Sequence, residues 1–571
     1  MLSKQQNYLD FTKDIKNIVA VTECLESFKT NLDKLELNIK NQELLVPIIG
    51  GFSSGKSSLI NSFLETNVLC VNITPETAIA TELRYSANEK VEAINDDGST
   101  EKFVVSELGN IQNKAQNYNH IKLYLNNEKL KNIEPIILVD MPGFNAPVAT
   151  HNKAIQKYMP SGVYFIALLS GADEKALQKT YLNELNGIYQ RDKEFTFCIS
   201  KTNLISQSDS NEIANCVKDQ LYGSFGYEKN IELLGLNSGE VLEKILKEID
   251  SEALFERIFK SSLEFLGTEL EGTINTSISA LRYNEQDAKD AMAELKNNTI
   301  AIEKQKQEAL RNASSKYSDN NIEGILSVAR RALENNVSMF AQSALRGGDI
   351  EKDISNIINS VLPPEIQKRL SGISKSVIDN FSINIRGVAF DTKNMQTWAD
   401  GLKDLVESAC FVVDTTLNNR GGRKGEKSLV LNSAVSMVGG HLAAQVLSKL
   451  GFVINPLIGT ILSAIFSILP GIFSKFAESK KEEVVKNKIK DEVIPSIISQ
   501  IRPELSAFIN EQVSQIINNI SLAFEEKISA EQANIEAITA QKASELGDIE
   551  ARIANLETQK NELKAISKKY I

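Results

Sequence analysis

The sequence is poor in aromatic residues and in proline. Aromatic side chains make up 6% of its 571 residues, and 12 residues are proline. All-β proteins usually need more residues that punctuate turns, whereas long helices tolerate this composition. The composition therefore disfavours a predominantly β architecture.

Cysteine and histidine are also scarce, with five and three residues. No Cys-x-x-Cys pair occurs, so the sequence predicts neither a disulfide framework nor a zinc site. Unpaired, scattered cysteines fit a reducing, cytosolic setting. The first charges of the N-terminus are not followed by an apolar run, so we expect no secretory signal there. The histidines, which are not spaced as metal ligands, are His120, His151 and His441.

Basic residues are outnumbered by acidic ones, 63 against 74, which gives a net charge of −11. Because phosphate neutralisation needs a basic face, nucleic acid is not expected as a partner. Charge is locally absent between Lys427 and Lys449, and again between Lys449 and Lys475. The basic residues that flank this apolar stretch are Arg420, Arg423, Lys424, Lys427, Lys475, Lys480 and Lys481.

Short apolar runs alternate with polar helical or loop segments within residues 46–250. This alternation is typical of a parallel sheet with crossover helices. The apolar runs are residues 45–49, 136–139, 163–169 and 195–199.

The chain outside these residues reads as helical. Residues 1–45 repeat apolar side chains at helical spacing, which predicts a helix. Residues 281–320 are polar and free of glycine, as in a long exposed or coiled-coil helix. A heptad spacing near the C-terminus predicts a coiled-coil seam. We hypothesise that the helices at the two ends of the chain pack together.

The most specific motif runs from Gly50 to Ser57 and reads GGFSSGKS, a complete G-x-x-x-x-G-K-[ST]. It follows an apolar run and precedes a helical segment, the context that a phosphate-binding loop requires. Backbone N–H groups of such a loop cradle phosphate at a helix N-terminus. Lys56 is expected at the β- and γ-phosphates and the Ser57 hydroxyl on Mg²⁺. The predicted nucleotide-binding residues of this motif are Gly50, Gly51, Phe52, Ser53, Ser54, Gly55, Lys56, Ser57 and Ser58.

A second motif, Asp140-Met141-Pro142-Gly143, follows the apolar run 136–139. Asp140 is expected to hold Mg²⁺ through a water, and the Gly143 N–H to face the γ-phosphate. ABC- and SMC-type ATPases place a catalytic glutamate directly after this aspartate, where this chain has Met141. Asp-x-Pro-Gly is the form found in GTPases.

A threonine between the two motifs is needed to give a hydroxyl to Mg²⁺ and an N–H to the γ-phosphate. Thr77, within the sequence Thr-Pro-Glu-Thr-Ala, is the predicted residue, and Thr74 and Thr81 are alternatives.

A weaker motif follows the apolar run 195–199. Lys201 and Asn203 stand where guanine-binding proteins have [NT]-K-x-D, so the Lys201 stem is expected over the base. Asn203 offers one acceptor and one donor, which removes the bidentate carboxylate contact, at a cost of about 1–3 kcal/mol. A base-side loop is expected at residues 237–239.

These motifs resemble those of the bacterial dynamin-like large GTPases. The segments that carry the resemblance are GGFSSGKSSLINSFL, PETAIATELRY, DMPGF and ISKTNL, all within residues 46–250. The resemblance implies a GTPase that couples binding and hydrolysis of GTP to membrane binding or remodelling. It also implies that the protein binds GDP and uses Mg²⁺. It also implies self-association through the heads, a companion dynamin-like subunit as a further partner, and a cytoplasmic, peripherally membrane-associated protein.

The fold implied is an α/β P-loop GTPase head with a mostly parallel sheet, on an extended all-α helical-bundle stalk with an apolar helical tip. The expected segments are an N-terminal helix packing with the neck (1–45), the GTPase domain (46–250), a helical neck and trunk (251–417), an apolar tip hairpin with basic flanks (418–481), and return helices with a C-terminal coiled coil (482–571).

Two residues depart from the family. Phe52 stands where eukaryotic dynamins carry a catalytic glutamine, which leaves Lys56, Ser53 and Thr77 as the catalytic candidates. Asn203 is the other departure, and together they predict slow turnover or relaxed choice of base. The alternative function is a nucleotide-binding scaffold or tether with weak or no hydrolysis.

The apolar stretch repeats large side chains every four residues over 457–473, with small residues such as Gly459 and Ser463 on the opposite face. Two helices packed through small faces present their apolar stripes outward, as membrane helix pairs do. The alternative is a soluble coiled-coil NTPase in which the hairpin is buried in a helical core. The residues expected at a membrane tip are Leu457, Ile461, Ile465, Phe466 and Phe473.

Overall fold

A computed structural model gives the fold, and the chain divides into two compact units. The head comprises residues 43–254, and the helical unit comprises residues 1–42 and 255–571. The structure describes residues 1–51, 53–70, 79–112, 117–143, 154, 157–159, 161–189, 193–346, 350–382, 392–410, 455–473, 482–544 and 549–571.

The described part of the head contains a nine-stranded sheet in the order β4-β3-β5-β2-β6-β1-β7-β8-β9. Strand β1 lies between β6 and β7 and is parallel to both, and β8 and β9 continue the parallel pairing. The strands are β1 (Leu44–Gly50), β2 (Thr81–Tyr85), β3 (Lys90–Asn95), β4 (Thr100–Phe103), β5 (Tyr118–Leu125), β6 (Ile136–Asp140), β7 (Tyr164–Ser170), β8 (Glu194–Ser200) and β9 (Glu232–Leu233).

The predicted parallel arrangement describes the centre of this sheet but not all of it. Strand β2 is parallel to β5 and antiparallel to β6, and β3 is antiparallel to both β4 and β5. The sheet is therefore mixed, and the predicted α/β head with a helical remainder is confirmed.

Both faces of the sheet are covered by apolar side chains. All seven residues of β1 are buried, and because side chains alternate along a strand they divide between two cores. Val46 and Ile48 belong to one core, and Leu45 and Ile49 belong to the other. Burial on both faces explains why this strand is an uninterrupted apolar run in the sequence. The helices of the head are α3 (Lys56–Leu64), α4 (Leu108–Gln112), α5 (Glu128–Asn132), α7 (Lys179–Tyr189), α8 (Gln207–Phe225) and α9 (Ser238–Glu248).

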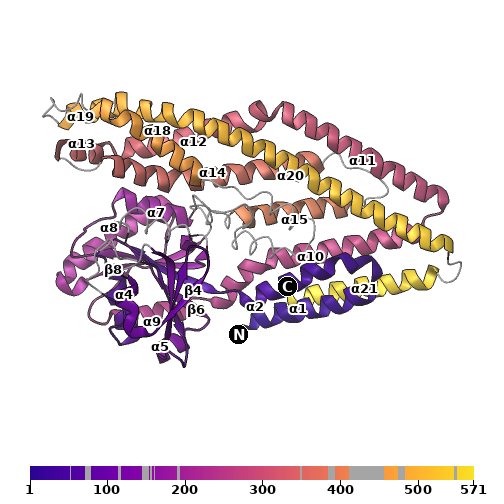
Figure 1. Ribbon diagram of the computed structural model, residues 1–571, viewed down its shortest axis with the longest axis horizontal. Coiled ribbons are helices and arrows are strands. Elements are labelled where there is room, and N and C mark those ends of the chain that lie inside the picture. The colour runs from indigo at the N-terminus through magenta and orange to yellow at the C-terminus, as the bar shows by residue number, and fades with distance from the viewer. Residues whose placement is uncertain are drawn as a thin grey trace. The chain divides into compact units, whose positions relative to one another are not determined.

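The helical unit is built around α20, a helix of 51 residues whose buried isoleucines contact α11, α12, α14 and α18 (Figure 1). Its helices are α1 (Ser3–Val21), α2 (Lys29–Asn41), α10 (Ser251–Arg282), α11 (Glu285–Arg311), α12 (Asp319–Asn335), α13 (Val337–Arg346), α14 (Ile350–Ser382), α15 (Thr392–Cys410), α18 (Asn455–Phe473), α19 (Glu482–Lys488), α20 (Ile494–Ser544) and α21 (Ile549–Tyr570).

Residues 1–45 are predicted to form a single helix, but residues 3–41 form a helical hairpin, and β1 begins at Leu44. Helix α1 ends at Val21, a 3₁₀ turn follows at Glu23–Phe28, and α2 returns alongside α1. The Gln5 side chain near the start of α1 donates to the Ile39 carbonyl near the end of α2, at 2.9 Å. Apolar periodicity continues through the turn because both helices bury one face, so the pattern did not reveal the break.

The two ends of the chain lie side by side in the helical unit (Figure 1). Tyr570 in α21 contacts the Phe11 ring edge-on in α1, with 6.5 Å between centroids. The Tyr570 hydroxyl donates to the Asp14 carboxylate at 2.9 Å. The pairing of terminal segments that the sequence left open is thus present.

The apolar stripe of α18 faces inward, so its expected outward presentation does not hold in this structure. Leu457, Ile461 and Ile465 are at most 7% exposed and belong to the core that α14 and α20 also line. Phe466 packs against the same core and is half-buried, and the side chain of Phe473 lies outside the described residues. The exposed positions are small or polar, such as Gly459 and Ser467.

Hydropathy does not distinguish the two cases, because an apolar stripe can be covered either by lipid or by an apolar groove of the protein. Here α14 and α20 provide that groove. The basic flanks and the preceding half of the predicted hairpin lie outside the described residues. Within the described ranges, no helix combines the length and apolar character needed to cross a membrane.

Candidate phosphate-binding site

The loop between β1 and α3 closes tightly against the neighbouring strand. A Cβ at Gly50 would lie 2.5 Å from the Leu168 carbonyl oxygen and 2.6 Å from Ser54 Oγ, so only glycine fits there. Gly55, directly before α3, has a φ of 85°, in the left-handed region that favours glycine. The two glycines therefore set the curvature that aims the first N–H groups of α3 at the loop.

Lys56 is the first residue of α3 and folds back into this loop. Its side chain is buried, and Nζ donates to the carbonyl oxygens of Gly50 at 3.2 Å and Gly51 at 2.8 Å. Burial lowers the pKa of Lys56 to about 8, and the charge of Asp140 opposes that shift. A buried ammonium group at the mouth of a loop rich in N–H donors is suited to hold an anion.

Ser57 and Asp140 come together from motifs that are far apart in the sequence. Ser57 Oγ donates to Asp140 Oδ2 at 2.6 Å. The other carboxylate oxygen, Oδ1, is buried and finds no hydrogen-bond partner among the described residues. Burial raises the pKa of Asp140, against the opposing effects of the Ser57 hydrogen bond and the Lys56 charge.

This donor set fits a magnesium ion. Mg²⁺ prefers oxygen ligands and usually takes one or two from protein carboxylates and hydroxyls while keeping several waters. The unpartnered Asp140 oxygen beside the Ser57 hydroxyl offers such ligands, and the buried Gly143 lies just beyond on the same chain.

The end of β8 is tied to the phosphate loop through Ser200. Its hydroxyl lies 2.6 Å from the Ser54 carbonyl oxygen, to which it donates, and 3.2 Å from that of Leu169. Lys201 follows with a φ of 56°, and its Nζ donates to Asp173 at 2.8 Å. The turn that contains Lys201 is thus tied to the loop between β1 and α3.

A comparison with known families finds a match within the head. Residues 46–202 match the model of the dynamin family. This part of the head is similar to the dynamin family. The match covers the phosphate loop, the Asp140 motif and the β8 strand end, which are the elements described above.

The individual curated proteins that are similar to this chain are distant from it in sequence. An uncharacterized protein of Caldicellulosiruptor is 24% identical over 282 residues, which cover 46% of this chain and 64% of that protein. Dynamin-like protein 2 of Campylobacter jejuni is 26% identical over 231 residues, which cover 40% of this chain and 35% of that protein. The chain spans between 32% and 64% of the length of the curated relatives that it matches.

Solved structures of bacterial dynamins are also similar to the chain. One, of an oligomerised bacterial dynamin pair, covers 98% of this chain and 82% of its own, at 16% identity and a TM-score of 0.36. Another, of the bacterial dynamin GTPase LeoA from ETEC, covers 95% of this chain and 97% of its own, at 12% identity and a TM-score of 0.24.

Several predicted site residues either lie outside the described residues or are not hydrogen-bonded to the Ser57–Asp140 pair in the described part of the chain. Phe52, Thr74 and Thr77 are outside them. Thr81, an alternative to Thr77, is buried in β2, and its hydroxyl donates to the Ile79 carbonyl at 3.3 Å.

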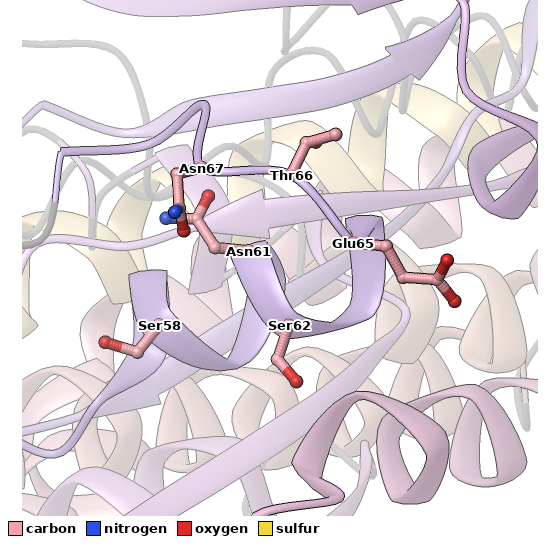
Figure 2. Close-up of a pocket in the computed structure, with 6 residues that line it drawn as sticks. All are labelled: Ser58, Asn61, Ser62, Glu65, Thr66 and Asn67. Atoms are coloured by element: carbon pink, nitrogen blue, oxygen red, sulfur yellow. The ribbon is translucent and has the colours of Figure 1, made fainter.

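Ser58 is exposed on α3, whereas Lys56 is buried in the loop. Figure 2 shows Ser58 with the other side chains that line a polar hollow along α3 and the segment after it. Ser53, in contrast, lies within the loop and is exposed. The residues that line the hollow are Ser58, Asn61, Ser62, Glu65, Thr66 and Asn67.

Within the predicted base-side loop, residues 237–239, Gly239 packs against α3. A Cβ at Gly239 would lie 2.4 Å from the Ser62 carbonyl oxygen, because this glycine packs against α3. The segment beside the Lys201 turn is earlier, since the Thr202 N–H donates to the Leu234 carbonyl at 3.2 Å.

Sequence reasoning did not assign Ser200 or Asp173 to the site. Ser200 stands at the first position of the [NT]-K-x-D motif, and this position could have indicated that Ser200 belongs to the site. Asp173 had none, because it comes from the turn after β7 and meets Lys201 only in the folded head.

Proposed function

We propose that this protein is a dynamin-like GTPase that binds GTP and GDP with Mg²⁺ and hydrolyses GTP. The observation that carries the proposal is the Ser57–Asp140 hydrogen bond beside the buried Lys56, within a loop that only glycine can close. The dynamin-family match over residues 46–202 supports the same activity.

Each residue has a role in this proposal. Loop N–H groups and Lys56 bind the β- and γ-phosphates, and the Gly143 N–H binds the γ-phosphate. Ser57, Thr77 and, through a water, Asp140 hold Mg²⁺, which supplies charge neutralisation for phosphoryl transfer. Ser53 is the proposed residue for orienting the attacking water, since Phe52 has no group that can do so.

Base selection is proposed to rest on the turn after β8. The Lys201 stem covers the base and Asn203 contacts its edge, while Ser200 fixes the turn to the phosphate loop. Because an amide replaces the carboxylate of [NT]-K-x-D, we expect a modest preference for guanine and slow turnover.

Side-by-side calorimetric titrations of the full chain with GTP and ATP, in Mg²⁺, test this proposal. We expect tighter binding of GTP and a loss of GTP affinity when Mg²⁺ is chelated. Equal affinities for GTP and ATP would contradict guanine recognition, and binding that does not respond to chelation would contradict the assigned metal ligands.

Self-association of heads and membrane binding are part of the proposal, supported by the resemblance to bacterial dynamin-like proteins. A companion dynamin-like subunit is a further proposed partner. Because the apolar stripe of α18 packs on α14 and α20, lipid contact through Leu457, Ile461 and Ile465 requires the stripe to leave this core. We therefore expect liposome sedimentation only in some nucleotide states, and no sedimentation in any state would contradict membrane binding.

A nucleotide-binding scaffold with weak or no hydrolysis is the second candidate. The exposed Asn203 amide favours it, because the carboxylate of a guanine-binding turn is missing. GTP binding without phosphate release, with and without liposomes, is the result that distinguishes this candidate from the GTPase.

A further inference from the structure

A buried carboxylate that is not among the predicted site residues lies next to the phosphate site. Glu82 is the second residue of β2 and is 1% exposed. It lies opposite Val139 in the antiparallel pairing of β2 with β6, and its neighbour Thr81 lies opposite Asp140. Glu82 is therefore one residue further along β2 than the position that pairs with Asp140, the proposed metal ligand on the adjacent strand β6.

Two of its partners come from the chain that follows the 140–143 turn. Lys157 Nζ lies 3.0 Å from Glu82 Oε1, and the Tyr158 hydroxyl donates to the same oxygen at 2.8 Å. Tyr158 is fully buried in the core that also contains Met141. One carboxylate oxygen thus joins β2 to helical residues that follow the Asp140 motif.

The other carboxylate oxygen is bound independently of that segment. Arg84 donates to Glu82 Oε2 from Nε at 3.1 Å and from Nη2 at 2.5 Å. Arg84 is itself held by a bidentate contact with Glu43, at 2.6 and 2.7 Å. Glu82 therefore stays charged and fixed on β2, since burial alone raises its pKa but Lys157 and Arg84 bring it well below the usual value.

We propose that Glu82 is a positioning residue for the phosphate site, and that its contacts with Lys157 and Tyr158 hold these two residues, which come after the Asp140 motif in the sequence, against β2. The inference rests on the proposed GTPase function and deepens it. A hydrogen bond or ion pair is directional where apolar packing is not, so these contacts select one position of Lys157 and Tyr158 relative to β2. Loss of these contacts should reduce turnover more than nucleotide affinity, because Lys56 and the loop glycines remain in place.

Tyr158→Phe is the test variant, because it removes one hydroxyl from Glu82 and keeps the buried ring. Tyr164→Phe is the matched control: its hydroxyl is also buried and lies 2.7 Å from Thr196 Oγ1, at the far end of β7 from the phosphate loop. Tm, the Kd for GDP and kcat for GTP are measured on the full chain. We expect Tyr158→Phe to lower kcat about tenfold, the loss set by one hydrogen bond to a charged group.

The Kd for GDP should change less than about twofold in the same variant, while Tyr164→Phe keeps the wild-type kcat at a similar Tm. Lys157→Met supplies a second readout, because it removes the other contact of the same oxygen. The double variant Lys157→Met/Tyr158→Phe should lose less kcat than the two single losses multiplied together, since both act through Glu82.

The outcomes separate the inference from the function on which it rests. A wild-type chain that hydrolyses GTP, with Tyr158→Phe at the wild-type kcat, overturns the inference and leaves the GTPase assignment intact. The inference is also overturned if Tyr158→Phe and Tyr164→Phe lose kcat to the same extent and in proportion to their losses of Tm. A wild-type chain without GTP turnover overturns both.

Discussion

His120 makes the stability of the head depend on pH. This residue of β5 is 6% exposed, and its Nε2 lies 3.6 Å from Glu82 without a hydrogen-bond partner in the described part of the chain. Burial, and then the charge of Lys157, lower the pKa of His120 from 6.5 to about 3. The folded head therefore keeps this imidazole neutral at pH values where an unfolded chain protonates it.

The sign and size of the effect follow from these two pKa values. Unfolding takes up a proton between about pH 6.5 and pH 3, so the free energy of unfolding falls as the pH falls through that window. Between pH 7 and pH 5 the loss is about 2 kcal/mol, since each pH unit below 6.5 contributes about 1.4 kcal/mol. For a unit of this size, that loss lowers Tm by about 4–8 °C.

Scanning calorimetry of the full chain at pH 7 and pH 5 measures this loss, with the transition that GTP shifts taken as that of the head. His120→Gln removes the titrating group and keeps a neutral polar side chain, so we expect its Tm to fall about 4–8 °C less than the wild-type Tm between these pH values. An equal fall in wild type and His120→Gln would refute the reasoning.

Three further variants test the site and the fold. Ser200→Ala removes the donor to the buried Ser54 carbonyl, so GTP should bind about tenfold more weakly in a calorimetric titration; unchanged affinity would show that the link is dispensable. Asn203→Asp should raise the preference for GTP over ATP by about tenfold to a hundredfold, measured as a ratio of Kd values, and a constant ratio would place the base elsewhere. Ile461 is fully buried in α18, so Ile461→Asp should lower the free energy of unfolding by about 3 kcal/mol or more, measured in urea. Ser467 is exposed on the same helix, so Ser467→Asp should not. Equal effects of the two substitutions would argue against the inward-facing stripe.

Features that depend on contiguous residues could be predicted from the sequence. The loop from Gly50 to Ser57 carries its own chemistry in one short segment, and Asp140 follows an apolar run that becomes β6. The uninterrupted apolar runs became the central strands because burial on both faces requires such runs.

Features that depend on residues far apart in the sequence could not be predicted from it. Glu82 meets His120, Lys157 and Tyr158 only after β2 joins the sheet antiparallel to β6, and the spacing of these residues carries no signal of that pairing. The prediction that the apolar stripe of α18 faces outward was wrong for a related reason. Hydropathy identifies which face of a helix is apolar, but whether lipid or α20 covers Ile461 depends on the rest of the fold.

Release of phosphate from GTP by the full chain, compared with the Lys56→Ala variant, tests the central claim most directly. Lys102→Ala, at an exposed position of the edge strand β4, is the matched control for loss of a lysine. We predict that wild type and Lys102→Ala hydrolyse GTP at the same rate in Mg²⁺ and that Lys56→Ala neither binds nor hydrolyses it. Turnover by Lys56→Ala at the wild-type rate would contradict the assignment of the head as a GTPase.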